Sequence, residues 1–288
     1  MNSVAEALRD GQTLSFEFFP PKTDEAQRAL HSIIGELMVA EPSFVSVTCG
    51  AGGQGHDRTR DIVVEIAAER PIPAVAHLTC VGHTRAQIEA LLDDYVGNGV
   101  TDVLALAGDW PADGSTPTGD FRFASELVEL IRARGDLSIG VAAHPEVHPR
   151  SASRSDDRRH LADKLAAADY AITQFFFDPT LYFELVEELA ALGVEKPIIP
   201  GVFPVTKPAV VKRFADLNGT HTPAELWARL EAASDADRET IAIDAAVELA
   251  QALLDGGAPG VHLYTMNRSA TALAIAERLG SARGHSPR

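Results

Sequence analysis

Short apolar runs alternate along the chain with longer segments in which apolar residues recur at helical spacing. The runs rich in β-branched and aromatic residues, which favour strands, lie at residues 15–19, 44–48, 74–79, 102–106, 138–143, 171–177, 197–203 and 261–266. Helices are expected between them, for example at residues 24–39, 84–97, 124–134, 180–191 and 235–254. Thr84 and Asp235 are the expected N-caps of two of these helices, and Gly99 and Gly135 are expected helix stops.

This alternation predicts an α/β protein with the architecture of a (β/α)8 TIM-type barrel. Strands that alternate with helices pair in parallel, and eight such units close a barrel. An open doubly wound sheet alternates in the same way, and it is the count of strands that favours the barrel. We expect a single domain over residues 1–288, with short flexible tails at about 1–12 and 281–288 and an extra helical excursion at 219–233.

Composition and charge restrict the partners and the location. The chain has 288 residues, of which 45% are hydrophobic and 23% charged, as in an ordinary globular protein. Its net charge of -16 repels phosphate backbones and anionic lipid, so we expect neither a nucleic-acid nor a membrane partner. Two cysteines exclude a disulfide framework. The sequence contains neither a secretory leader nor an apolar run of about 18 residues, so the cytoplasm is the expected location.

Glu17 is the first candidate for chemistry, because barrel active sites lie at the carboxyl ends of the strands. Phe16 and Phe18 share one face of the first predicted strand, and Glu17 lies on the other. If the two phenylalanines pack outward under the helices, Glu17 points into the lumen. Burial there favours the protonated carboxyl that a general acid requires. A structural salt bridge would account for the same residue equally well.

Two further candidates lie at the ends of other predicted strands. The fourth strand ends in LALAGDWP, where Gly108 permits close backbone approach and Asp109 follows it. Gln174 lies among the aromatic residues of the sixth run, where a buried amide needs hydrogen-bond partners that a ligand can supply. A turn or helix-cap role for Asp109 and a core hydrogen bond for Gln174 are the alternatives.

The histidines do not form a recognisable metal motif. His144 and His148 have helical spacing, but Pro145 opposes the helix that would align their rings, so we expect no metal site. The glycine-rich stretch at residues 50–55 matches neither of the common phosphate-binding loops.

Seven motifs in order and register resemble those of the 5,10-methylenetetrahydrofolate reductase family, from about residue 15 to about residue 280. They are SFEFFPPKT (15–23), FVSVTCGAGG (44–53), AHLTC (76–80), AAHPEVHP (142–149), YAITQFFFD (170–178), IIPGVFPV (198–205) and YTMNR (264–268). The resemblance implies an α/β barrel that binds FAD and uses NADH or NADPH to reduce 5,10-methylenetetrahydrofolate to 5-methyltetrahydrofolate. It leaves open whether the chain forms a homo-oligomer, as relatives usually do.

The resemblance also implies a role for each matching position. Glu17 is then the acid that helps to open the five-membered ring of the folate, and Asp109 lies between flavin and pterin. Gln174 would bind the pterin, Phe214 would stack in turn on nicotinamide and folate, and Arg268 would contact the distal part of the folate. The positions that the family pattern assigns to FAD are Thr48, His77, Gly108, Asp109, Ala124, His144, His148, Asp157, His160 and Lys164.

Three positions depart from the family pattern. Ala107 replaces the arginine that lies along the flavin, His144 replaces a tyrosine or phenylalanine, and Val210 stands where some members carry a folate-binding glutamine. Loss of the guanidinium weakens FAD binding by about 1.5–3 kcal/mol, the contribution of a charged hydrogen bond. The alternatives are therefore direct hydride transfer from NADH without flavin, a barrel that binds folate or flavin without catalysis, and another flavin barrel such as a proline-oxidising enzyme.

Overall fold

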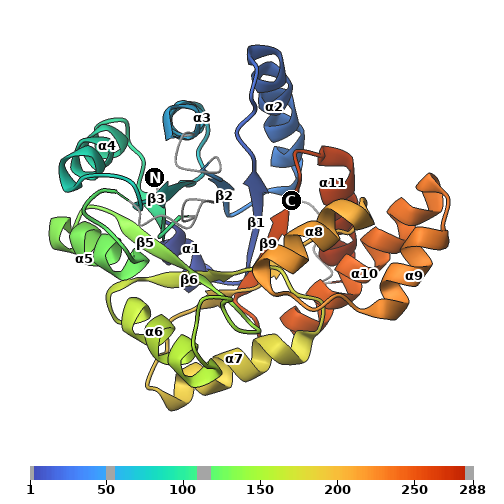
Figure 1. Cartoon of the computed structure of the whole chain (residues 1–288). Helices are drawn as coiled ribbons and strands as arrows, with labels where there is room; N and C mark the ends of the chain where they lie inside the picture. The colour runs from blue at the N-terminus through green and yellow to red at the C-terminus, as the bar shows by residue number, and fades with distance from the viewer. Residues whose placement is uncertain (1–2, 50–55, 109–117, 283–288) are drawn as a thin grey trace.

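The computed structural model describes residues 3–49, 56–108 and 118–282, and its strands belong to one parallel sheet (Figure 1). The strands are β1 (Thr13–Phe18), β2 (Phe44–Val47), β3 (Ala74–Thr79), β4 (Asp102–Leu106), β5 (Ser138–Ala143), β6 (Tyr170–Thr173), β7 (Ile198–Ile199), β8 (Gly201–Val202) and β9 (Gly260–Tyr264). The helices are α1 (Val4–Asp10), α2 (Asp24–Leu37), α3 (His56–Glu69), α4 (Arg85–Gly97), α5 (Ala124–Arg134), α6 (Arg154–Ala167), α7 (Pro179–Ala191), α8 (Pro208–Asn218), α9 (Ala224–Ala232), α10 (Asp235–Asp255) and α11 (Ser269–Ala282), with a short 3-10 turn at Met38–Ala40.

The sheet closes on itself through Pro200. The strand order is β7-β6-β5-β4-β3-β2-β1-β9-β8, and its two end members, β7 and β8, are consecutive in the chain on either side of this proline. Proline has no N–H to donate, which interrupts the regular ladder. Its carbonyl still accepts a hydrogen bond of 2.9 Å from the backbone N–H of His262. β7 and β8 are thus two halves of one strand, and the predicted eight-stranded barrel is confirmed.

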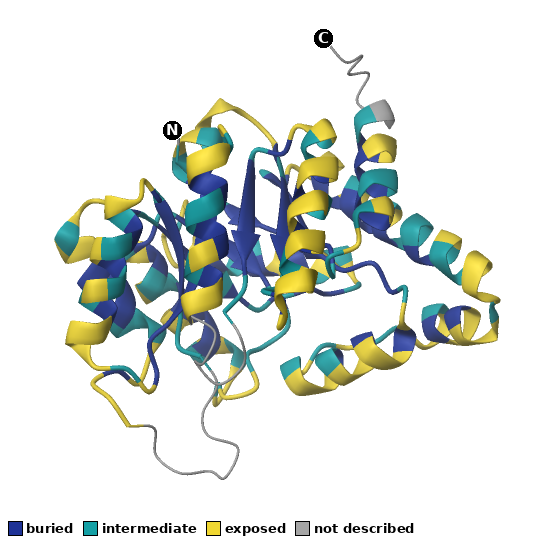
Figure 2. Cartoon of the chain, turned by 90° about the horizontal axis from the view of Figure 1, so that it is seen from above, coloured by how far each residue is buried: buried dark blue, intermediate teal, exposed yellow. Residues whose placement is uncertain are grey.

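Helices cover the outside of the barrel and bury its main core. Phe16 and Phe18 belong to this core, which lies between the strands and the surrounding helices. Figure 2 shows the same layering, with buried strands inside helices whose outer faces are exposed. Helix α9, inside the predicted excursion, lies outside α8 and α10 (Figure 1) and packs in a smaller cluster that includes Trp227 and Leu230. No described helix is both long and apolar enough to cross a membrane.

The amino-terminal segment differs from the flexible tail expected over residues 1–12, because it contains the capped helix α1. Ser3 accepts a hydrogen bond from the backbone of Glu6, and the Glu6 carboxylate accepts one from the backbone of Ser3. This reciprocal pair is a capping box. Val4 is buried in a separate cluster with Phe44 and Val75, so α1 is anchored to the barrel strands. Residues 283–288 of the other expected tail lie outside the described residues.

Asp102, at the start of β4, fastens α1 to the barrel. Its carboxylate accepts hydrogen bonds from the backbone N–H of Val4 at 2.9 Å and from the hydroxyl of Thr101 at 2.6 Å. Burial raises the pKa of this carboxyl from 3.8 to about 6. The folded protein therefore holds a proton here between about pH 4 and 6 that the unfolded chain has lost.

The replacement Asp102→Asn should remove a pH-dependent loss of stability. The raised pKa means that the ionised side chain destabilises the folded state above about pH 6, by roughly 2–3 kcal/mol, and that this penalty is absent below about pH 4. The free energy of unfolding of the variant, measured with urea, should thus rise relative to the parent protein as pH increases from 4 to 7. A difference that stays constant over this range would contradict the assignment.

Several boundaries differ from the sequence prediction. β6 ends at Thr173 instead of residue 177, and the seventh strand is split by Pro200. Ser234, not Asp235, is the N-cap of α10, because its hydroxyl accepts the hydrogen bond of the Asp237 N–H. Thr84 caps α4 as predicted, within a capping box formed with Gln87.

Candidate active site

The polar residues of the lumen gather around Glu17 on β1. Its side chain is only 6% exposed, and its Oε2 lies 3.4 Å from Nε2 of both His77 on β3 and His262 on β9. Burial lowers the pKa of His77, so this imidazole is neutral at pH 7 and adds no positive charge beside the carboxyl. The outward packing of Phe16 and Phe18 confirms the predicted orientation of Glu17.

His262 is a site residue that the sequence analysis missed. Its ring is fully buried, with Nδ1 at 2.8 Å from the hydroxyl of Ser15 and Nε2 at 3.3 Å from that of Ser46. The Ser15 hydroxyl also donates to the carbonyl of Val261 at 3.3 Å. In that arrangement Nδ1–H donates to Ser15, which leaves Nε2 as the nitrogen facing Glu17. Nε2 of His262 is thus close to both Ser46 and Glu17 in the lumen.

Two polar atoms at the ends of β2 and β3 have no hydrogen-bond partner among the described residues. They are Oγ1 of Thr48 and Nε2 of His77, both buried, although the latter lies 3.4 Å from Oε2 of Glu17. Buried polar atoms are normally paired, so an unpaired one calls for a ligand or water. Both residues belong to the set expected to bind the flavin, and they fit a ligand with polar groups.

Gly108 follows β4 in a conformation that few other residues adopt. Its φ is +89°, and a Cβ at this position would lie 3.1 Å from Cβ of Thr79. This agrees with the close approach expected of the backbone here. Asp109 lies outside the described residues, as does the glycine-rich stretch at 50–55. Ala124 is the first residue of α5.

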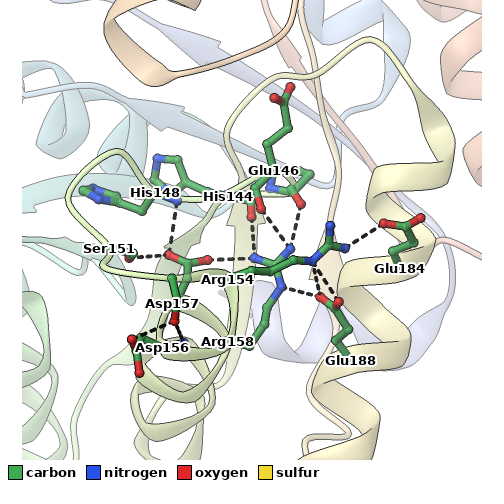
Figure 3. A network of polar contacts seen from close by, with 12 residues as sticks. His144, Glu146, His148, Ser151, Arg154, Asp156, Asp157, Arg158, Glu184 and Glu188 are labelled. Atoms are coloured by element: carbon green, nitrogen blue, oxygen red, sulfur yellow. Dashed lines mark hydrogen bonds and ion pairs between the residues drawn. The ribbon is translucent and has the colours of Figure 1, made fainter.

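The loop between β5 and α6, together with α6, brings together four of the residues expected to bind FAD, and Figure 3 shows three of them, His144, His148 and Asp157. The rings of His144 and His148 meet edge to face with centroids 4.5 Å apart. Oδ1 of Asp157 accepts hydrogen bonds from the His148 N–H at 3.2 Å and from the Ser151 hydroxyl at 2.8 Å. Burial lowers the pKa of His144 to about 3, so its imidazole is a neutral aromatic ring where the family has a tyrosine or phenylalanine.

Lys164, the fourth of these residues, is a cation with one hydrogen bond to another described residue. Its Nζ donates to the carbonyl of Ala142 at 3.1 Å, although an ammonium group has three protons to donate. Burial lowers the pKa of Lys164 to about 8, while the carboxylate of Asp157 opposes this shift. A cation so placed fits an anionic ligand. His160, one turn earlier on α6, is exposed.

Of the residues expected to bind the folate, Gln174 and Arg268 come after β6 and β9, and Phe214 lies on α8. Gln174 directly follows β6, and its Oε1 accepts a hydrogen bond of 3.0 Å from the N–H of Phe175. Phe214, on α8, is half-buried, with its ring centroid 6.4 Å from that of Phe203. Val210 lies one turn before Phe214 and is exposed. The Arg268 guanidinium is more exposed and lies 3.5 Å from the Glu239 carboxylate.

The chain is similar to proteins of one family over nearly its whole length. A family model described as Methylenetetrahydrofolate reductase matches residues 2–280. A relative from Escherichia coli (strain K12), named 5,10-methylenetetrahydrofolate reductase, is 37% identical over 283 residues, which cover 96% of this chain and 94% of the relative. The Arabidopsis thaliana protein named Methylenetetrahydrofolate reductase (NADH) 1 is 34% identical over 97% of this chain and 50% of its own length.

A solved structure supports the fold independently. It is an uncharacterized protein from Clostridium thermocellum that binds two copies of 5-methyl-5,6,7,8-tetrahydrofolic acid, and it is similar with a TM-score of 0.62 at 17% sequence identity. The similarity covers 96% of this chain and 97% of that one. At this identity the likeness concerns the fold alone.

Proposed function

Because the chain belongs to the methylenetetrahydrofolate reductase family, we propose that it reduces 5,10-methylenetetrahydrofolate to 5-methyltetrahydrofolate with a hydride from NADH or NADPH. The observation that carries the proposal is the buried Glu17 carboxyl between two imidazoles, of which His77 is neutral. An acid held in the lumen serves a reaction that needs a proton, whereas a barrel that only binds folate has no use for one. The enzyme is thus an oxidoreductase.

We propose FAD as the cofactor. When bound, FAD supplies the hydride chemistry, and the protein supplies binding, orientation and proton transfer. The residues present fit such a group, because among the described residues the buried hydroxyl of Thr48 has no hydrogen-bond partner and the ammonium of Lys164 has one. Lys164 would hold an anionic part of the cofactor, and the neutral ring of His144 would offer it an aromatic face.

Glu17 delivers the proton in this proposal. Opening the five-membered ring of the folate requires a proton on the departing nitrogen, and ring opening leaves the iminium carbon that accepts the hydride. The proton comes from the Glu17 carboxyl, whose Oε2 lies 3.4 Å from Nε2 of His262. Gln174 would bind the pterin and Phe214 would stack in turn on nicotinamide and folate. Arg268 would contact the distal part of the folate, and Asp109 is assigned the place between flavin and pterin.

The substrates proposed are small molecules, the folate and the pyridine nucleotide. The net charge of -16 supports the absence of a nucleic-acid or membrane partner. We propose the cytoplasm as the location, in keeping with a chain whose two cysteines, Cys49 and Cys80, form no disulfide. A homo-oligomer, usual among relatives, is compatible with this proposal.

Ala107 supports a second candidate function, in which NADH transfers its hydride directly to the folate without flavin. Replacing Ala107 with the arginine of the family pattern tests both candidate functions. Ala107→Arg should bind FAD about 10–150-fold more tightly than the parent chain, because it adds a charged hydrogen bond of about 1.5–3 kcal/mol. Flavin fluorescence measures the affinity, and Ala107→Met, which adds length without charge, is the matched control.

The outcomes of that experiment separate the two candidates. Flavin bound by the parent protein, and more tightly by the arginine variant, supports the FAD-dependent enzyme. If neither protein binds flavin and NADH still reduces methylenetetrahydrofolate, the result supports direct hydride transfer from NADH and contradicts the FAD-dependent reaction. If no reduction occurs under either condition, the chain is a binding protein and both candidates fail.

A further inference from the structure

Arg158, on α6, forms hydrogen bonds to the β5–α6 loop with its guanidinium group (Figure 3). Nη1 donates to the carbonyl of His144 at 3.0 Å, and Nη2 donates to those of Pro145 and Glu146 at 2.8 and 3.0 Å. Nη1 also donates to Oδ2 of Asp157 at 2.7 Å, and Nε to Oε2 of Glu188 at 2.7 Å. These contacts use all five N–H groups that an arginine has.

The charge of Arg158 is balanced although it is buried. Its side chain is only 3% exposed, and the carboxylates of Asp157 and Glu188 lie on two sides of it. Burying a cation costs several kcal/mol unless it is paired and hydrogen-bonded. Arg154 shares Glu188 with Arg158 and also pairs with Glu184, both on α7. The guanidinium of Arg158 therefore pairs with Glu188 of α7 on one side and donates hydrogen bonds to the loop carbonyls on the other.

We propose that Arg158 is a positioning residue that fixes the β5–α6 loop, and with it the imidazoles of His144 and His148, in the arrangement that receives the cofactor. Three consecutive carbonyls bound to one rigid planar group define the path of the loop. Asp157 also fixes the loop, because its Oδ1 accepts hydrogen bonds from the His148 N–H and the Ser151 hydroxyl. Nδ1 of His148 in turn accepts a hydrogen bond from the Arg150 N–H at 3.1 Å, which sets the tautomer of that ring.

The hydrogen bonds of Arg158 to the loop also keep the imidazoles of His144 and His148 neutral. Burial is the main cause of the lowered pKa of both His144 and His148, and it depends on the closed loop. The charged groups that act on His144 are Asp157, which raises its pKa, and Lys164 and Arg158, which lower it together with the neighbouring ring of His148. The proposal rests on the proposed function, since FAD is the ligand assigned to this loop.

Arg158→Lys tests the proposal without relying on activity. Lysine keeps the charge but has three donors in place of five, so it cannot hold three carbonyls and two carboxylates. The loop should loosen, and the pKa of His144 should rise from about 3 toward the 6.5 of an exposed histidine. The imidazole signals of the ligand-free protein, followed by NMR from pH 3 to 8, report this shift. FAD binding should weaken about tenfold, since a loose site must be ordered by its ligand.

Arg154→Lys is the matched control, because Arg154 pairs with the same Glu188 and, among the described residues, with no loop carbonyl. It should leave the titration of His144 unchanged. An unchanged His144 titration in a folded Arg158→Lys protein would overturn the proposal. So would rapid hydrogen exchange at the His148 amide of the parent protein, a measurement that needs no variant. Failure of the parent protein to bind FAD would overturn the cofactor assignment instead and leave the NMR result to decide on Arg158.

Discussion

Glu17→Gln should lose nearly all reduction of methylenetetrahydrofolate, by about 10²–10⁴-fold, the usual contribution of a positioned general acid. The amide keeps the shape of the side chain between His77 and His262 but has no acidic proton to give to the departing nitrogen. Oxidation of NAD(P)H by the flavin-loaded protein needs no such proton and should change by only a small factor. Single-turnover absorbance measurements with each substrate separate the two effects.

A control must show that the amide itself is harmless. Glu187→Gln makes the same chemical change on an exposed position of α7 and should leave both measurements unchanged. If Glu17→Gln slows both reactions equally, Glu17 maintains the lumen or the cofactor site and does not act as the acid. If it slows neither, another residue supplies the proton.

Lys164→Met should stabilise the ligand-free protein and weaken cofactor binding at the same time. The lowered pKa of Lys164 means that its charge is unfavourable in the folded state below about pH 8, by roughly 3 kcal/mol at pH 7, and the methionine removes this cost. The same ammonium would donate to an anionic group of FAD, and loss of that charged hydrogen bond weakens binding about 10–150-fold. Urea unfolding and flavin fluorescence measure the two effects.

The prediction for Lys164→Met also includes a pH dependence of the free energy of unfolding and of FAD affinity. The unfavourable charge is present at pH 7 and is lost as pH rises from about 8 toward 10.5, so the stability gained by the methionine variant should shrink over that range. FAD affinity of the parent protein should fall above about pH 8, because the ligand-free lysine is then neutral. Lys196→Met, at an exposed position before β7, is the control. A less stable Lys164→Met protein with normal FAD affinity would show that the lysine is structural.

The sequence is informative wherever one local rule decides the outcome. The alternation of Phe16, Glu17 and Phe18 places the carboxyl in the lumen, because strand side chains point to opposite faces. The capping box formed by Ser3 and Glu6 is equally local, and the spacing of these two residues would have shown that α1 starts there. His262 could not be found so simply. A histidine between Val261 and Leu263 has the pattern of an ordinary core position, and only the register that pairs it with Ser15 brings it to Glu17.

Arg158 shows what sequence patterns miss at the site. Helix α6 is rich in charged residues, and the spacing of Arg158 to Leu161 and Leu165 places it on their buried face without showing what its guanidinium contacts. Its importance comes from the carbonyls of residues 144–146, whose direction is a property of the folded loop. Pro200 is a similar case, because a proline inside an apolar run predicts an interruption but not that the two halves pair with different neighbours.

The pairing of β1, near the start of the chain, with β9 has a consequence for protein synthesis. Thr13 pairs with Gly260 and Glu17 with Tyr264, so β1 gains its second neighbour only after residue 264 has left the ribosome. At about 5–20 residues per second, this takes roughly 12–50 s. During that time one edge of a strand with the sequence TLSFEF is unpaired and prone to associate with other chains. A nascent chain stalled before β9 is therefore a natural client for chaperones, although every strand but the last has already been made.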